Sequence, residues 1–241
     1  MTVGAIAAQW PATRMVLEKH GIDYCCQGHR SLRAAVAAAK AHLPEVLGAL
    51  RKVAARPPAR KGPVRVWTGS SASELADHIE SRHHAYMKEN LPRLTALLEK
   101  VRGAHDRAHG PMLRKLQEVF LSLKQEIESH LRKEERVLFP LIRQMDAHLV
   151  EGGPKPVCHC GTVENPIRQM RSEHETAGEA LARLRELSHG YALPDDACAS
   201  FRALYEGLQA MEDDLHEHIH LENNILFPKA VSLEERTVSA T

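Results

Sequence analysis

Apolar side chains recur three and four positions apart over most of the chain beyond residue 72, and this spacing predicts long amphipathic helices. Four such stretches cover about residues 73–103, 111–147, 166–188 and 194–231. A proline opens each of the last three, where the first helical turn tolerates it. Because the connections are mostly short, we expect an all-α fold built on an antiparallel four-helix bundle.

The apolar face of each predicted helix is interrupted by a histidine, and two of the faces also carry a glutamate four positions later. In chain order the faces are His84, Met87, Leu91, Leu94 and Leu98; Leu116, Phe120, Leu123, Ile127, His130, Glu134, Val137 and Leu141; Met170, His174, Ala177, Leu181 and Leu184; and Phe201, Leu204, Leu208, Met211, Leu215, His218, Glu222 and Ile225. A histidine helix is followed by a His-x3-Glu helix, and the same order then repeats. The pattern therefore indicates a tandem duplication.

The duplication is clearest in one phrase, which occurs as HLRKEERVLFP from His130 and as HIHLENNILFP from His218. Residues four apart share a helix face, so the histidine and the glutamate of each phrase can bind one centre. Burial of an unpaired carboxylate is costly, and a metal ion supplies the missing counter-charge. Histidine and carboxylate without thiolate suit iron, manganese or zinc.

We therefore predict a dinuclear metal site in the bundle, with Glu134 and Glu222 suited to bridge the two ions. A lone histidine on an apolar face is more often a hydrogen-bonded core residue, and a lone His–Glu pair is more often a surface pair. Six such residues in phase and arranged as a repeat favour metal binding over these alternatives. The predicted ligands are His84, His130, Glu134, His174, His218 and Glu222.

The other histidines of the 16 fall outside this pattern. His83 is one position out of phase, and His216 and His220 align with polar residues, while His78 is a candidate to support the ligands from outside. We expect the following to be solvated residues in loops or near helix ends: His20, His29, His42, His105, His109, His148 and His189.

A linker is predicted within ARPPARKGPVRVWTGSSA at residues 55–72, which is rich in proline, glycine and small polar residues. It divides the chain into a small helical amino-terminal domain over 1–55, a linker over 56–72 and the four-helix bundle over 73–235.

Composition narrows the choice of partners. Lys and Arg number 32 and Asp and Glu 31, so neither nucleic acid nor an anionic membrane is expected as the main partner. No apolar stretch approaches the roughly 18 residues of a membrane-spanning helix. The five cysteines include an adjacent pair and do not suggest a disulfide framework. We expect a cytoplasmic protein.

The arrangement of a histidine helix and a His-x3-Glu helix, taken twice, resembles the hemerythrin-like cation-binding domains. DYCCQGHRSL at 23–32, followed by HHAYMKENLPRL, HLRKEERVLFP, RSEHETAGEAL and HIHLENNILFP, is more specifically similar to the di-iron iron–sulfur cluster repair family, also called repair-of-iron-centres proteins. The resemblance covers nearly the whole chain. It implies two non-haem iron ions with an oxo or hydroxo bridge, held by the six predicted ligands.

The resemblance also implies a function, the repair of iron–sulfur proteins damaged by nitrosative or oxidative stress through supply of iron. Some relatives bind nitric oxide instead, so a nitric-oxide buffer, sensor or reductase linked to denitrification is the alternative. Damaged iron–sulfur proteins and small gases such as nitric oxide or oxygen are the expected partners. Enzymatic turnover, as a nitric oxide reductase or on peroxide at the di-iron site, and a homodimer are left open.

The cysteines carry separate hypotheses. Cys25 and Cys26 belong to the family pattern and are candidates for redox or transient metal-binding thiols, although adjacent side chains diverge; the alternative is a packed hydrophobic pair. Cys158, His159 and Cys160 form a compact cluster outside the family pattern, which is either an accessory metal site or a loop without such a role. Cys198 is expected to be a buried small residue.

Overall fold

The computed structural model describes residues 1–55, 66–152, 156 and 161–239. Within these residues the regular elements are helices, and Thr2 and Ser31 form an isolated antiparallel bridge. The chain divides into two compact parts. The bundle part comprises Asp77–Leu141 and Glu164–His216, and the amino-terminal part comprises Met1–Ala76, Ile142–Val163 and Glu217–Thr241.

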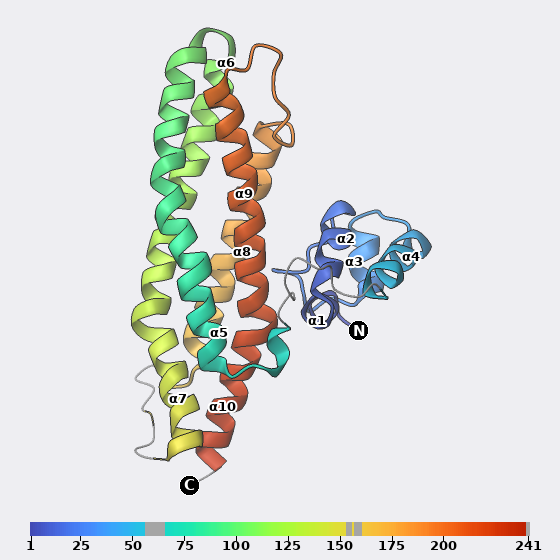
Figure 1. Cartoon of the computed structure of the whole chain (residues 1–241), viewed down its shortest axis with the longest axis vertical. Helices are drawn as coiled ribbons and strands as arrows, with labels where there is room; N and C mark the ends of the chain where they lie inside the picture. The colour runs from blue at the N-terminus through green and yellow to red at the C-terminus, as the bar shows by residue number, and fades with distance from the viewer. Residues whose placement is uncertain (56–65, 153–155, 157–160, 240–241) are drawn as a thin grey trace. The chain divides into compact units, whose positions relative to one another are not determined.

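The bundle part consists of long helices that lie side by side (Figure 1). Its elements, some of which continue beyond it, are α5 (Ala72–His78), the π-helical turn η3 (Ile79–His84), α6 (Ala85–Lys133), the π-helical turn η4 (Glu134–Leu138), α8 (Glu164–Leu187) and α9 (Ala199–Leu221). Two helices are joined in α6 across a kink at His105, whose φ and ψ are −120° and 16°. The helices predicted before and after residues 104–110 are therefore joined directly at this kink, without a separate loop between them.

The predicted apolar faces form the core of the structure, with one exception. Every residue assigned to the four faces is buried except Val137, which is 48% exposed. The prediction for Val137 was wrong because the π-helical turn η4 adds a residue to the helical turn and moves the buried face by one position. Leu138 and Phe139 occupy the interior there instead.

The amino-terminal part begins with short helices, as predicted. They are α1 (Val3–Gln9), the 3₁₀ helix η1 (Pro11–Thr13), α2 (Arg14–Lys19), α3 (Leu32–Ala38) and α4 (Leu43–Ala54). Thr2 and Ser31 cap α1 and α3, because their hydroxyls accept hydrogen bonds from Ala5 N at 3.3 Å and Ala34 N at 3.2 Å. Val3 and Leu17, which are fully buried, lie in the core of these helices.

The same part contains the 3₁₀ helix η2 (Trp67–Gly69), most of α7 (Phe139–Glu151), the π-helical turn η5 (Glu222–Leu226) and α10 (Phe227–Ser239). Lys229 Nζ on α10 donates to the carbonyl oxygens of Thr68 at 2.9 Å and Ser70 at 2.7 Å. These bonds hold the end of the predicted linker against α10. Residues 56–65 of that linker and the Cys158, His159 and Cys160 cluster lie outside the described residues.

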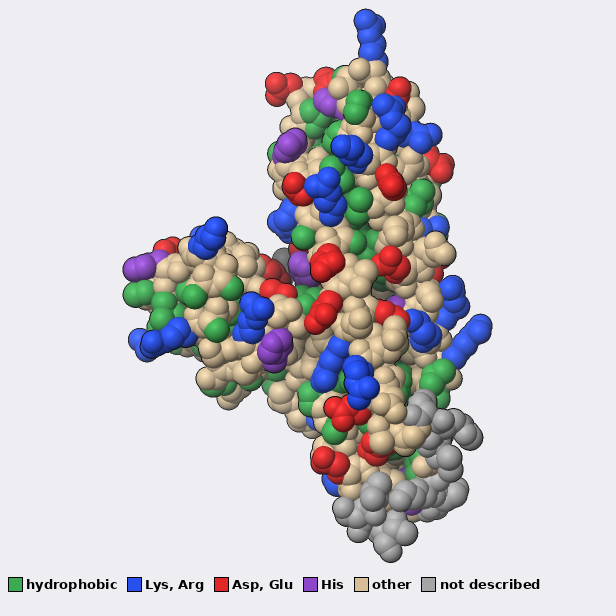
Figure 2. Space-filling view, turned by 180° about the vertical axis from the view of Figure 1, so that it is seen from behind, with side chains coloured by type: hydrophobic (Ala, Val, Ile, Leu, Met, Phe, Trp, Pro, Cys, Tyr) green, Lys and Arg blue, Asp and Glu red, His purple; other side chains and the backbone are tan. Residues whose placement is uncertain are grey.

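On the face that Figure 2 draws, basic and acidic side chains are interspersed over the described surface. Among the described residues, no helix is long and apolar enough to cross a membrane.

Candidate metal centre

Three of the six predicted ligands lie in π-helical turns. His84 ends η3, Glu134 begins η4 and Glu222 begins η5. A π-helical turn rotates the following residues relative to a regular α-helix and is frequent at functional sites. The apolar pattern of the sequence did not predict these turns. Their signal is the paired apolar residues that follow each glutamate, Leu138-Phe139 and Leu226-Phe227, where a regular helix needs one.

Within the bundle part, four predicted ligands converge. Glu134 Oε2 lies 3.4 Å from His84 Nε2 and 3.4 Å from His130 Nε2. His174 Nε2 lies 3.1 Å from His130 Nε2. Glu134 is fully buried, and the three histidines are at most 7% exposed. An interior carboxylate faces imidazole nitrogens from three helical segments.

The remaining two predicted ligands are neighbours on one helical segment. His218 Nε2 lies 2.9 Å from Glu222 Oε1, and both residues are buried. The i,i+4 spacing places both side chains on the same face, as the sequence predicted.

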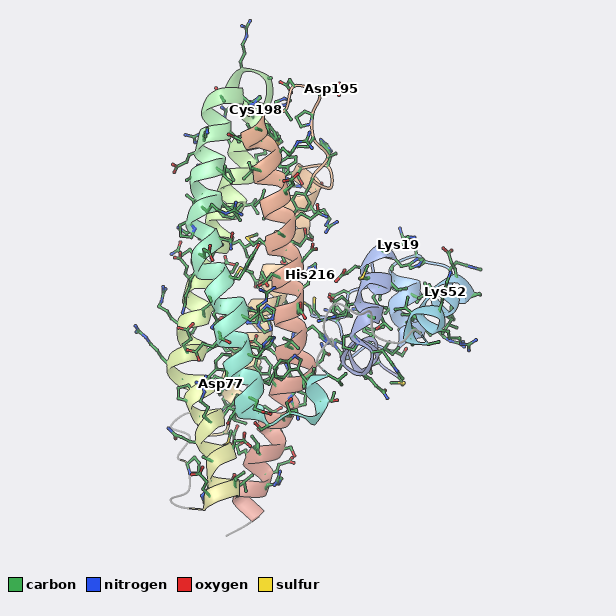
Figure 3. The ribbon with its side chains drawn as sticks, viewed as in Figure 1. Lys19, Lys52, Asp77, Asp195, Cys198 and His216 are labelled. Atoms are coloured by element: carbon green, nitrogen blue, oxygen red, sulfur yellow. The ribbon has the colours of Figure 1, made fainter. Side chains whose placement is uncertain are left out.

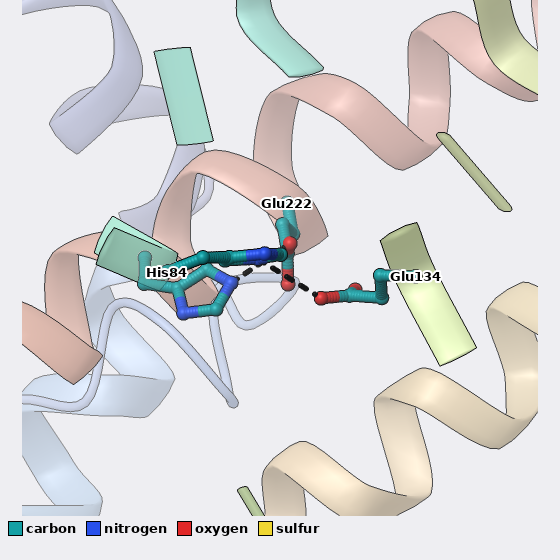
Figure 4. Close-up of side chains that lie close together, drawn as sticks. His84, Glu134 and Glu222 are labelled. Carbon is teal, nitrogen blue, oxygen red and sulfur yellow. Dashed lines mark hydrogen bonds and ion pairs between the residues drawn. The ribbon is translucent and has the colours of Figure 1, made fainter. Parts of the chain in front are cut away.

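All six predicted ligands fall into two groups in which each residue offers one ligand atom within 4.8 Å of the others. The groups are His84, Glu134, His218 and Glu222, and His130, Glu134, His174 and Glu222. Figure 4 shows the polar ends of His84, Glu134 and Glu222 turned toward one another. Both carboxylates belong to both groups, which is the arrangement that two bridging glutamates require.

Two further glutamates orient the histidine rings. His84 Nδ1 lies 2.8 Å from Glu135 Oε1, which also accepts from Lys88 Nζ at 2.6 Å. Partial burial raises the pKa of Glu135, but the hydrogen bonds from Lys88 and His84 outweigh it and lower the pKa overall. The carboxylate is therefore ionised and accepts a hydrogen bond from Nδ1–H of His84.

Glu173 does the same for His130. His130 Nδ1 lies 2.8 Å from Glu173 Oε2, and Lys133 and Gln169 also donate to this carboxylate. Partial burial raises the pKa of Glu173, whereas the hydrogen bonds from His130, Lys133 and Gln169 lower it to about 2. A neutral histidine that donates from Nδ1 keeps its lone pair at Nε2, and the Nε2 atoms are the ones that face the centre.

These residues fit a metal centre by the chemistry of their donor atoms. Lone pairs of imidazole nitrogens and buried carboxylate oxygens face one another, and such a set is stabilised by a shared cation. The helical pattern of the sequence did not predict a role for Glu135 or Glu173. Each stands next to a predicted ligand, Glu134 and His174 respectively, but the histidine that it serves lies on another helix.

Two histidines set aside by the sequence pattern are nevertheless buried. His83 is 1% exposed, and its Nδ1 lies 3.1 Å from Asp214 Oδ1. The ring of His78 meets that of His83 edge-on, with 5.6 Å between centroids. His220, which was assigned to a polar face, is also 1% exposed. That expectation was wrong because Tyr24, from the segment between α2 and α3, covers it with a ring centroid 5.3 Å away.

Asn224 anchors the amino-terminal helices to the last helical segment. Its Nδ2 donates to Tyr24 O at 3.1 Å and to His220 Nδ1 at 3.1 Å. Burial, aided by Arg14, lowers the pKa of His220 to about 3, so the ring is neutral and can accept. A Cβ on Gly4 or on Gly28 would approach Asn224 Oδ1 to 2.0 or 2.2 Å, so both glycines leave the space that Asn224 fills.

Cys25 and Cys26 lie together in the amino-terminal part. Their sulfur atoms are 3.9 Å apart, which is closer than the expected divergence. Asp23 Oδ1 accepts from the backbone N–H of Cys25 at 3.0 Å and of Cys26 at 2.9 Å, and Asp23, Cys25 and Cys26 form a further group of potential ligand atoms within 4.8 Å. The hydrogen bond with Cys26 and burial raise the pKa of Cys25. Cys198, in contrast, is exposed rather than buried as expected.

Comparison with known proteins agrees with this geometry. The model of the Hemerythrin HHE cation binding domain family matches residues 75–230, and a domain of unknown function, ScdA_N (DUF542), matches residues 1–54. The protein called iron-sulfur cluster repair protein YtfE in Citrobacter koseri is 34% identical over 96% of this chain and 97% of its own. The protein of the same name in Escherichia coli O157:H7 has the same identity and coverage. The chain therefore belongs to the hemerythrin HHE cation-binding family and, within it, to the iron–sulfur cluster repair proteins.

Proposed function

We propose that the six predicted ligands hold two non-haem iron ions, with Glu134 and Glu222 bridging them. The membership of both carboxylates in both ligand groups is the observation that carries this proposal. Histidine and carboxylate without thiolate suit iron, and the hemerythrin family binds non-haem iron. When bound, the ions supply a pair of redox-active centres with an oxo or hydroxo bridge.

The protein residues have separable roles at such a centre. Glu134 and Glu222 neutralise the charge of the ions inside the core, and the four histidines complete the ligand set. Glu135 and Glu173 hold the rings of His84 and His130 so that Nε2 points inward. The apolar side chains of the faces around them exclude water from the centre.

We infer that the protein restores damaged iron–sulfur clusters, with iron as the substance that it supplies. The support is the name of the relatives together with a similarity that covers both the bundle and the thiol-bearing amino-terminal helices. Iron is then cargo as well as a bound group, and damaged iron–sulfur proteins are the partners.

Cys26 is a better candidate than Cys25 for a thiol that binds this iron as it is transferred. Cys25 is buried, and its raised pKa keeps it protonated, whereas Cys26 is partly exposed. Asn223 Nδ2 donates to Cys25 O at 3.3 Å, so the cysteine pair is attached to the residue that follows Glu222. A thiol near the end of the ligand helix is placed to bind an iron ion as it leaves the centre.

The test is reconstitution of an iron–sulfur cluster in an apo-acceptor protein by the iron-loaded chain. We expect faster cluster formation than with the same concentration of free ferrous iron, and no such gain with Glu134→Ala/Glu222→Ala. The matched control is Glu175→Ala/Glu179→Ala, which removes two exposed glutamates of α8 and should behave as the parent. Equal rates for the parent and free iron would contradict the repair function.

The same preparation distinguishes the alternative. A nitric-oxide buffer or sensor would form a stable nitrosyl spectrum under nitric oxide and retain all of its iron in the presence of the acceptor. A repair protein loses iron to the acceptor, so the iron content of the two proteins after separation decides between them.

A further inference from the structure

A group of side chains that could hold a metal ion lies at the end of the bundle part where α6 turns. His105 stands at the kink of α6, His109 lies one turn later, and Asp196 precedes α9. Figure 3 labels Cys198 and the neighbouring Asp195 at this end, with Asp77 toward the other. At about 1.5 Å per residue, His105 is roughly 30 Å along the helix from His84, so this group is distinct from the predicted iron site.

The donor atoms of this group already converge. His109 Nε2 lies 2.8 Å from Asp196 Oδ1, and His105 Nδ1 lies 3.8 Å from Asp196 Oδ2. Potential ligand atoms of all three residues lie within 4.8 Å of one another. One carboxylate thus faces two imidazoles that belong to a different segment of the chain.

Phe201, the first predicted core residue of α9, fixes both imidazole rings. Its ring meets that of His105 edge-on at 5.2 Å between centroids and that of His109 at 5.8 Å. Phe201 is fully buried, so the rings rest on a rigid support. The side chain of His105 is only 11% exposed and that of His109 is 25% exposed, which limits their rotamers.

Cys198 lies beside this group and does not belong to it. Its side chain forms a hydrogen bond with His105, but its sulfur is not among the ligand atoms that lie within 4.8 Å of one another.

Two explanations suit an Asp–His contact on a surface, an ordinary ion pair and a metal site. An ion pair of Asp196 with His109 accounts for one contact. It does not account for the second histidine at i,i+4, whose Nδ1 lies 3.8 Å from the same carboxylate. Two imidazole nitrogens and a carboxylate oxygen make three of the four ligands of a tetrahedral zinc site, and water can take the fourth position.

We propose that His105, His109 and Asp196 bind one zinc ion. The ion joins the kink of α6 to the start of α9 and so fastens two helical segments that are distant in the sequence. Binding to the folded state alone stabilises this end of the bundle. The proposal does not depend on the function of the iron site.

The first experiment measures zinc bound by the full, iron-loaded chain after equilibrium dialysis, with iron measured in the same sample. We expect one zinc per chain with no loss of iron, and loss of that zinc in His105→Ala/His109→Ala. The matched control, His29→Ala/His189→Ala, removes two exposed histidines and should keep the zinc. Zinc retained by His105→Ala/His109→Ala would overturn the proposal, because the ion would then be bound elsewhere in the chain.

A milder variant guards against loss of folding. Asp196→Asn alters an exposed side chain, and we expect it to weaken zinc binding at least about 10-fold while the circular dichroism and iron content stay those of the parent. Zinc binding unchanged in Asp196→Asn would overturn the proposed site.

Discussion

The two copies of the repeated phrase, at residues 130–140 and 218–228, have the same inner face and different outer faces. On the inner face each copy offers a histidine and a fully buried glutamate to the predicted iron site. On the outer face of the first copy, Arg136 and Val137 are exposed. Their counterparts in the second copy are Asn224, whose Nδ2 donates to Tyr24 O, and Ile225, which is only 5% exposed.

This difference shows which positions the metal chemistry determines and which the surroundings determine. Glu135 in the first copy accepts from His84, whereas its counterpart Asn223 donates to Cys25 O. One position therefore supports a ligand in one copy and holds the amino-terminal helices in the other. Each experiment below changes both copies at one position, and the difference between the two results is the quantity of interest.

The largest effect is expected where the copies are the same. Glu134→Gln and Glu222→Gln should each weaken iron binding more than about 100-fold, since each carboxylate belongs to both ligand groups. Iron per chain by elemental analysis should fall from about two to well below one in both variants. Loss of one iron in one variant and of none in the other would contradict two equivalent bridges.

Stability of the metal-free chains separates this result from a failure to fold. Glutamine keeps the shape of glutamate and removes a charge buried in the core, so the metal-free variants should unfold at the same or a higher denaturant concentration than the metal-free parent. Metal-free variants that are markedly less stable would mean that the carboxylates have a structural role.

A large effect confined to one copy is expected at Val137 and Ile225. Ile225→Ala removes a buried side chain and should lower the free energy of unfolding by about 2–4 kcal/mol. Val137→Ala changes an exposed side chain and should stay within about 0.5 kcal/mol of the parent. Denaturant unfolding followed by circular dichroism measures both, and similar losses would place Val137 in the core as its sequence position predicts.

An intermediate effect is expected at Glu135. Glu135→Gln leaves His84 with a weaker acceptor, and iron affinity should fall about 10–100-fold in a competition with a chelator. The matched change in the other copy, Asn223→Ala, should leave iron affinity as in the parent, because Asn223 bonds to Cys25 O. Equal effects of the two substitutions would remove the distinction drawn between the outer faces.

The helices, their buried faces and the burial of the six predicted ligands could be deduced from the sequence because all depend on the period of one helix. The π-helical turns could not, since a shift of one residue alters which of Val137 and Leu138 is buried without altering composition. Propensity scales contain no signal for such a turn. A slip in the apolar pattern after a buried glutamate is the feature to look for.

Contacts between distant segments account for the other differences. His220 is buried by Tyr24, and His130 is oriented by Glu173, and neither partner is predictable from the helix that carries the histidine. The same holds for Cys198, whose hydrogen bond to His105 spans the kink of α6 and the segment before α9. Periodicity identifies what faces inward, whereas the identity of the covering residue requires the fold.

The smallest effect is expected where the second copy is converted to the first. Asn224→Arg removes the donor to Tyr24 O and places a longer side chain against Gly4 and Gly28, which have no room for it. Loss of this bond should weaken the attachment of residues 22–30 to the last helical segment by about 1–1.5 kcal/mol, which corresponds to about a tenfold loss of protection against hydrogen exchange. Hydrogen exchange of peptides that cover residues 22–30 measures it.

The reverse exchange in the first copy, Arg136→Asn, is the control. Arg136 is exposed, so its replacement should leave both hydrogen exchange and iron content as in the parent. Iron content should also be unchanged in Asn224→Arg, because Asn224 bonds to Tyr24 and His220 and belongs to neither group of iron ligands. Unchanged hydrogen exchange in Asn224→Arg would show that the contacts of Asn224 with Tyr24, Gly4 and Gly28 do not hold the amino-terminal helices in place. Loss of iron in that variant would show instead that the outer face of the second copy serves the metal centre, as Glu135 does in the first.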